Sequence, residues 1–424
     1  MRSAAEMRGL RDLLVAAIRG GGETVEAMHA SIARIPFGIL ERVPPTRLSA
    51  IAARRLHDGI ARWVYGGIRG GVALAGGAAG LALAPIGEAR RDADGPAPAS
   101  WDHVLGALNG VVGDRLERDR NALGMRMEFR HGGRRLELDA ASLRRSHPGA
   151  APRVAVFVHG LAGSERVWSF YSEEHYGDLE TTYGTRLQNE LGYTPLYVRY
   201  NSGLHISENG ARLAEEMERL VRAWPVAVEE IALVGHSMGG LVVRSACHQA
   251  TQAGGSWVDA VRHVFCLGSP HLGAPLEKLG NVAGWLLAQS EVARPLGRIV
   301  NGRSAGIKDL RFGYLVDEDW RGRDLDALLE NNRHDIPFLD AATHYFIAAT
   351  VTRSPRHPLG FVLGDTLVRF PSAAGRAGTP ARRIPFRVEH GHHLGRMTHL
   401  RLLNHPAVYD QIRRWLEPMP SAEA

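Results

Sequence analysis

The most constraining feature of this sequence is a Gly-His-Ser-Met-Gly motif between an apolar run and a helical segment. Residues 229–234 read as a buried strand, and residues 241–247 continue with a helical pattern. A Gly-x-Ser-x-Gly motif at a strand-to-helix junction is typical of a nucleophile elbow, a sharp turn that strains the backbone of Ser237 and exposes its hydroxyl. Side chains at Gly235 and Gly239 would collide with the neighbouring strand and helix. A Gly/Ser-rich turn without chemistry is the alternative, and the flanking strand and helix favour the elbow.

The composition is that of a globular protein with a large core. The 424 residues are 45% hydrophobic and 23% charged. The net charge is +6, but the arginines are scattered, which argues against a nucleic-acid-binding stripe. We interpret Cys247 and Cys266 as buried apolar residues, since two cysteines make no disulfide framework. The apolar run at 13–18 is too short for a secretory signal, so we expect a cytoplasmic protein, free or associated with a membrane.

The chain divides into three expected regions. Residues 1–95 are helical in pattern, apolar and rich in glycine and alanine. Within them, residues 60–87 could pack on the rest of the protein or on another subunit, contact a membrane peripherally or span it, and we favour these in that order. Residues 96–150 contain a linker, a helix and a β-hairpin. Residues 151–418 form the catalytic domain, with a cap at about 275–340 because that stretch is too long for an ordinary connection.

Apolar strands and amphipathic helices alternate through the chain. The hairpin strands are expected at 125–130 and 135–138 and the remaining strands at 154–158, 196–200, 231–234, 261–267, 344–351 and 384–388. The helices are expected at 101–120, 209–224, 239–253 and 407–416. This alternation predicts an α/β fold with a mostly parallel, doubly wound sheet and helices on both faces. Pro385 places the last strand at an edge.

A serine nucleophile needs a base, and the base needs an orienting acid. In this architecture the three follow in the order Ser, Asp/Glu, His. Asp365 comes after the strand at 344–351. It lies between Gly364 and the apolar residues 367–368, which suits a fixed carboxylate that points inward, so we expect it to be the acid. Asp365 could instead cap a turn. Asp340 is the second candidate, although it precedes the strand.

The base is one of several histidines near the end of the chain. Five follow the last expected strand: His390, His392, His393, His399 and His405. We favour His399, because the leucines after it can anchor the loop before the final helix, and we place His393 second. A metal site built from these histidines is disfavoured, because the sequence has no cysteine ligand spacing and no His-Glu-x-x-His helix.

Two backbone amides are needed to hold the oxyanion. The amide of Met238, directly after the nucleophile, is one candidate. The amide of Leu161 is the other, since it lies in the loop after the strand at 154–158 and Gly160 gives that loop room to turn. His159 precedes the serine in the chain, so we expect it to hold the loop and not to act as the base.

Three motifs resemble a known group of enzymes. They are Phe-Val-His-Gly-Leu at 157–161, Gly-His-Ser-Met-Gly-Gly at 235–240 and Gly-Ser-Pro-His-Leu-Gly-Ala-Pro at 268–275. Together they are similar to the bacterial lipases and esterases related to the GPI inositol-deacylase family, over residues 150–418. The resemblance implies an α/β-hydrolase fold with Ser237 as nucleophile.

The resemblance extends to the other two catalytic positions. Gly-Asp-Thr-Leu-Val at 364–368 is similar to the family's Gly-Asp-Gly-Leu-Val, with Thr366 departing from its glycine. His-Leu-Arg-Leu-Leu at 399–403 is similar to the segment that holds the family's histidine. Residues 1–95 have no counterpart in the family.

These observations predict a serine hydrolase that cleaves carboxylic esters through an acyl-enzyme, with no metal or organic cofactor. The expected partner is a small-molecule or lipid ester. An acyltransferase with the same triad, or a hydrolase-fold scaffold at a membrane without turnover, are the alternatives.

Overall fold

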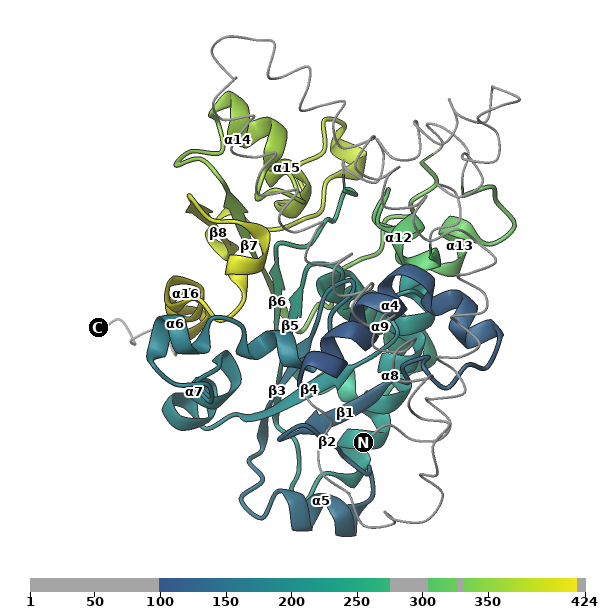
Figure 1. Cartoon of the computed structure of the whole chain (residues 1–424), viewed down its shortest axis with the longest axis vertical. Coiled ribbons are helices and arrows are strands. Elements are labelled where there is room, and N and C mark those ends of the chain that lie inside the picture. Colours follow the sequence, from purple (N-terminus) through teal and green to yellow (C-terminus); the bar gives the residue numbers. More distant parts are fainter. Residues whose placement is uncertain (1–98, 275–303, 326–330, 418–424) are drawn as a thin grey trace, which may run out of the picture.

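The computed structural model describes residues 99–274, 304–325 and 331–417 (Figure 1). Its centre is an eight-stranded sheet with the strand order β2-β1-β4-β3-β5-β6-β7-β8. The six strands from β4 to β8 in this order are all parallel to one another, whereas β1 is antiparallel to both β2 and β4. The predicted mostly parallel α/β sheet is therefore confirmed.

The sheet strands are β1 (Glu128–His131), β2 (Arg134–Arg135), β3 (Arg153–Val158), β4 (Thr194–Arg199), β5 (Glu230–His236), β6 (Val261–Leu267), β7 (Thr343–Thr350) and β8 (Gly391–Gly395). The α-helices are α4 (Ala99–Arg118), α5 (Ala140–Ser146), α6 (Ser172–Tyr176), α7 (Tyr183–Leu191), α8 (Ile206–Ala223), α9 (Met238–Ala253), α12 (Ala305–Asp309), α13 (Asp317–Trp320), α14 (Pro358–Leu363), α15 (Phe370–Ala373) and α16 (Pro406–Leu416). Short 3₁₀ helices are η2 (Glu165–Ser169), η3 (Ser256–Ala260), η4 (Pro380–Arg382), η5 (Val388–His390) and η6 (His399–Leu402).

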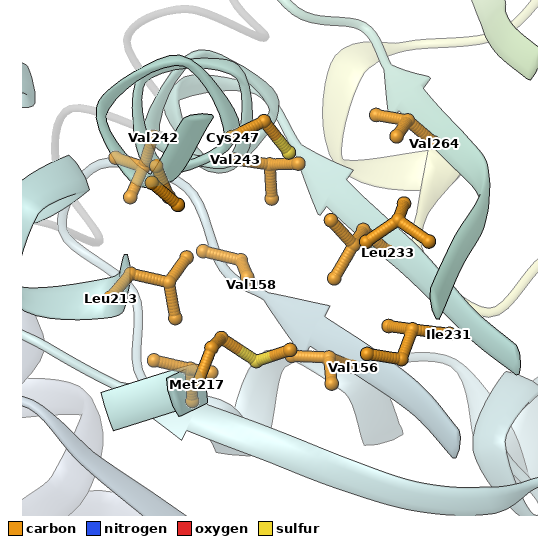
Figure 2. Close-up of a cluster of buried hydrophobic side chains, with 14 of the residues drawn as sticks. Val156, Val158, Leu213, Met217, Ile231, Leu233, Val242, Val243, Cys247 and Val264 are labelled. Carbon is orange, nitrogen blue, oxygen red and sulfur yellow. The ribbon is translucent and has the colours of Figure 1, made fainter. Parts of the chain in front are cut away.

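Helices cover both faces of the sheet, because successive strand residues point to opposite sides. On one face, Val156 and Leu233 pack with side chains of α8 and α9, as Figure 2 shows for Leu213, Met217 and Val243. On the other face, alternate residues of the same strands pack with α7 and α16. The strands are apolar on both sides because both sides are buried. This topology is that of the α/β-hydrolase fold.

The direction of winding reverses between β3 and β5. From β3 the chain first adds β4 on one side and then returns to add β5 on the other. In open parallel sheets, sites form beyond the carboxyl ends of the strands at such a reversal. The loop after β3 and the turn after β5 meet there, and these are the segments that contain Leu161 and Ser237.

One predicted strand is wrong. Residues 384–388 form no strand in the structure, and the edge strand is β8, which pairs with β7. The chain turns at 384–386 instead, because the Phe386 amide donates to the Ile384 carbonyl. Pro385 has no N–H that could donate a hydrogen bond to a neighbouring strand. Strand β8, Gly-His-His-Leu-Gly, lacks the β-branched pattern by which strands are recognised.

The expected N-terminal region at 1–95, including residues 60–87, lies outside the described residues, as does much of the expected cap. The described part of the cap contains α12 and α13. Among helices of the described ranges, none has the length and apolar character needed to cross a bilayer.

Candidate active site

Ser237 occupies a strained turn between β5 and α9. Its φ is +54° and its ψ is −123°, a combination that non-glycine residues rarely adopt. A Cβ at Gly235 would overlap the backbone of Gly240, and one at Gly239 would overlap the carbonyl of Val158. The sharp turn and the need for both glycines are thus as predicted for an elbow.

Asp365 and His399 lie together although 34 residues separate them. His399 Nδ1 is 2.7 Å from Asp365 Oδ2, and the His399 amide donates to the Asp365 carbonyl at 2.8 Å. Asp365 Oδ1 accepts the amides of Leu367 and Val368 at 3.0 and 2.8 Å. Both side chains are buried, with 1% of Asp365 and 3% of His399 exposed. The carboxylate is therefore fixed on one side by two amides and faces the imidazole on the other.

The imidazole of His399 lies beside the elbow. Its ring centroid is 4.8 Å from that of His236, the residue before Ser237, and His236 Nε2 is 3.2 Å from the His399 carbonyl. A Cβ at Gly268 would lie 3.2 Å from His399 Cε1, and the preceding residue, Leu267, accepts the Ser237 amide. Burial, reinforced by the neighbouring His399, lowers the pKa of His236 well below its usual value. His236 is therefore neutral at neutral pH and packs against His399.

The loop after β3 lies against the other side of Ser237. A Cβ at Gly160 would come within 2.9 Å of Ser237 Cβ, so only glycine fits there. Burial lowers the pKa of His159 to about 4, and its Nδ1 lies 2.8 Å from the Gly160 carbonyl. Within the described ranges, the amides of Leu161 and Met238 donate to no acceptor.

The second-choice residues lie elsewhere. His393 is in β8, where its Nε2 is 2.8 Å from Thr350 Oγ1. Asp340 precedes β7 and lines a cavity of about 130 Å³ with Arg244 and His344. None of the residues lining that cavity is Ser237, Asp365 or His399, so it is separate from the site. The described residues hold no group of three or more side chains suited to binding a metal ion.

Sequence reasoning missed the contribution of α4. Gly106 and Gly110 of this helix face the loop after β3: a Cβ at Gly106 would lie 2.6 Å from the Gly163 carbonyl oxygen, and one at Gly110 2.8 Å from Ala162 Cα. The helix is also tied to the sheet by Asp102, which lies 2.8 Å from the buried Arg199. The signal in the sequence was the four-residue spacing of the glycines, which permits close backbone approach on one helix face.

A comparison with known protein families finds a match in the middle of the chain. Residues 150–340 match the family model "Putative serine esterase (DUF676)". The DUF676 match includes Ser237, Leu161 and Met238 and ends before Asp365 and His399. It supports a serine hydrolase of the ester-cleaving type.

Solved structures with similar folds are distant in sequence. Mature lipase BlEst2 of Bacillus licheniformis is 20% identical, with a TM-score of 0.40 over 63% of this chain and 92% of that chain. Staphylococcus hyicus lipase is 14% identical, with a TM-score of 0.32 over 62% and 94%. Phospholipase PlaB from Legionella pneumophila is 13% identical, with a TM-score of 0.32 over 53% and 46%. No curated protein matches the chain.

Proposed function

We propose that the protein is a carboxylic ester hydrolase that acts on acyl esters through a triad of Ser237, His399 and Asp365. The observation that carries the proposal is the buried Asp365–His399 hydrogen bond, placed beside a serine in elbow geometry. The DUF676 match supports the same class of reaction. The resemblance of the motifs to bacterial relatives of the GPI inositol-deacylase family favours a lipid ester.

The reaction follows from the roles of these groups. His399 takes the proton of Ser237 as its oxygen attacks the ester carbonyl, and the amides of Leu161 and Met238 hold the oxyanion. The carbonyl–alkoxy bond then breaks, and the leaving alcohol receives the proton from His399. Water, deprotonated by His399, attacks the acyl-enzyme and releases the acid and free Ser237. Asp365 keeps the proton of His399 on Nδ1 and stabilises the imidazolium.

A fluorophosphonate probe tests the proposal because it reacts only with an activated serine. We expect the wild-type protein to be labelled and Ser237→Ala not to be labelled. His399→Ala should lower kcat/KM on a nitrophenyl ester by about 10⁴-fold or more, since the base is lost.

His393→Ala is the matched control, because it removes a histidine of the same region that bonds Thr350 instead. This variant should keep nearly full activity and labelling. A folded wild-type protein that neither takes the probe nor cleaves esters would refute the proposal. Equal losses in the two histidine variants would refute the assignment of His399.

A further inference from the structure

Exposed apolar side chains are concentrated next to the site. The described residues include six strongly exposed large hydrophobic side chains: Leu179, Val226, Phe361, Val362, Leu367 and Val388. Three of the six lie within seven positions, on α14 and the turn that leads to Val368. Phe361 is 55% exposed, Val362 45% and Leu367 38%. Exposed apolar side chains that are scattered singly are ordinary on a protein surface, whereas several in one short segment call for a functional explanation.

The charge around this surface has one sign. Between Val351 and Val388 there are seven arginines, and the only acidic residue is Asp365, which is buried against His399. Arg353 and Arg356 are exposed in the loop before α14. Arg369 donates from Nε to the Val362 carbonyl at 3.0 Å, which places its cation beside the apolar side chains. The exposed charge of the segment is therefore entirely positive.

The helix is attached directly to the loop that supplies Asp365. The Val351 amide at the end of β7 donates to the Gly364 carbonyl at 2.8 Å, and Gly364 donates to Gly360 at 2.9 Å. In Figure 1, α14 lies at one end of the molecule with α15, beyond β7 and opposite α5. A ligand that binds α14 is therefore held near the carboxyl end of β7, where Asp365 and His399 meet.

We infer that α14 and its flanking loop dock on a lipid surface with anionic headgroups. We call Phe361, Val362, Leu367, Arg353 and Arg356 the α14 surface. Apolar side chains that enter the acyl boundary, beside arginines that pair with headgroup phosphates, are the combination by which proteins bind such surfaces. The inference rests on the proposed function and deepens it: the ester is presented from a membrane or lipid aggregate at the edge of the site.

Sedimentation of the full chain with vesicles tests the inference without turnover. One vesicle preparation is phosphatidylcholine alone, and the other contains phosphatidylglycerol in equal parts. The wild-type protein should prefer the anionic vesicles. Phe361→Ser/Val362→Ser should weaken binding to them about tenfold or more, as apolar burial is lost. Arg353→Gln/Arg356→Gln should weaken it about tenfold and remove most of the preference.

Matched control variants remove the same kinds of side chain, apolar and cationic, elsewhere on the surface. Leu179→Ser removes an apolar side chain that is 66% exposed, and Arg134→Gln/Arg144→Gln removes two exposed arginines of β2 and α5. Both controls should bind as the wild type does. All variants should cleave a soluble nitrophenyl ester at the wild-type rate, which separates docking from chemistry.

Two results would overturn the inference. One is wild-type protein that does not sediment with anionic vesicles, and the other is vesicle binding that is unchanged in both α14 variants, in which case another segment of the chain makes the contact. Failure of the proposed function would give a different result. Vesicle binding would still depend on the α14 surface, but the fluorophosphonate probe would not label Ser237.

Discussion

At the residue scale, the two oxygens of Asp365 have separate partners. Oδ1 accepts two backbone amides, and Oδ2 faces His399 Nδ1. An asparagine at this position must keep its oxygen toward the two amides, because an NH₂ group cannot accept from them. Its NH₂ would then face His399 and force the proton of the imidazole onto Nε2.

This arrangement predicts a large effect for Asp365→Asn. His399 in the wrong tautomer cannot accept the proton of Ser237, so kcat should fall about 10⁴-fold while KM changes little. Steady-state kinetics on a soluble ester measure this, and circular dichroism verifies that the variant is folded. A loss below tenfold would show that Asp365 does not orient the base.

Thr366, next to the acid, has a backbone conformation that suits glycine. Its φ is +96°, and a β-branched residue is strained there by about 1–3 kcal/mol. Glycine relieves the strain but costs about 0.5–1 kcal/mol through the entropy of the unfolded chain. We therefore expect Thr366→Gly to raise the free energy of unfolding by about 1 kcal/mol, as measured by urea denaturation. Thr366→Ala keeps the positive φ and should show no such gain; a gain of equal size in both variants would argue against strain.

At the element scale, α4 supports the loop that supplies the Leu161 amide. A methyl group at Gly110 would lie 2.8 Å from Ala162 Cα, which is backbone and cannot move without its loop. We expect Gly110→Ala to displace this loop and lower kcat by about 10²-fold, since small displacements of catalytic groups have effects of that size. Kinetics of the folded variant test this.

Gly149→Ala is the control for Gly110→Ala, because no atom lies within 4 Å of a Cβ at Gly149. It should leave kcat unchanged. Full activity in Gly110→Ala would mean that the loop adjusts to the added methyl group without moving the Leu161 amide.

The strands that were predicted differ from β8, which was not, in how local their cause is. β6 was predicted at 261–267 and is found there, since its apolar run is buried on both faces. β8 has only glycine, histidine and leucine, and it becomes a strand because β7 offers it an open edge. Ile384 and Phe386 supplied the apolar pattern of a strand, but their segment turns at Pro385.

At the scale of the whole molecule, an ion pair between His205 and the buried Asp309 helps to join the described part of the cap to the helices that cover the sheet. His205, before α8, lies 2.9 Å through Nδ1 from Asp309 of α12, and its ring stacks on Trp320 of α13 at 3.6 Å. Burial of the ring opposes protonation, but the Asp309 carboxylate outweighs it and raises the pKa of His205 above 6.5.

This raised pKa predicts how stability depends on pH. Protonated His205 is favoured in the folded state, so its contribution is complete below pH 6.5 and is lost as the pH rises through the raised folded pKa. The free energy of unfolding should therefore fall more steeply in the wild type than in His205→Gln as the pH rises above 6.5. Urea denaturation of both proteins at several pH values gives the difference between their free energies of unfolding. The contributions of the other histidines are the same in both proteins and cancel in this difference. Parallel curves would show that the pair does not titrate in this range.

The sequence by itself determined the elements whose causes lie within a few residues. The strand, glycines and helix around Ser237 specify the elbow because each acts on its immediate neighbours, and the apolar runs specify strands buried on both faces. Only the tertiary structure decided which distant groups meet. It selected His399 over His393 as the partner of Asp365, set the glycine face of α4 against the loop of Leu161, and tied the residue after α14 to the end of β7 through the Val351 amide and the Gly364 carbonyl. Those pairings depend on how the sheet stacks segments far apart in the chain, and no local pattern encodes a distance across the fold.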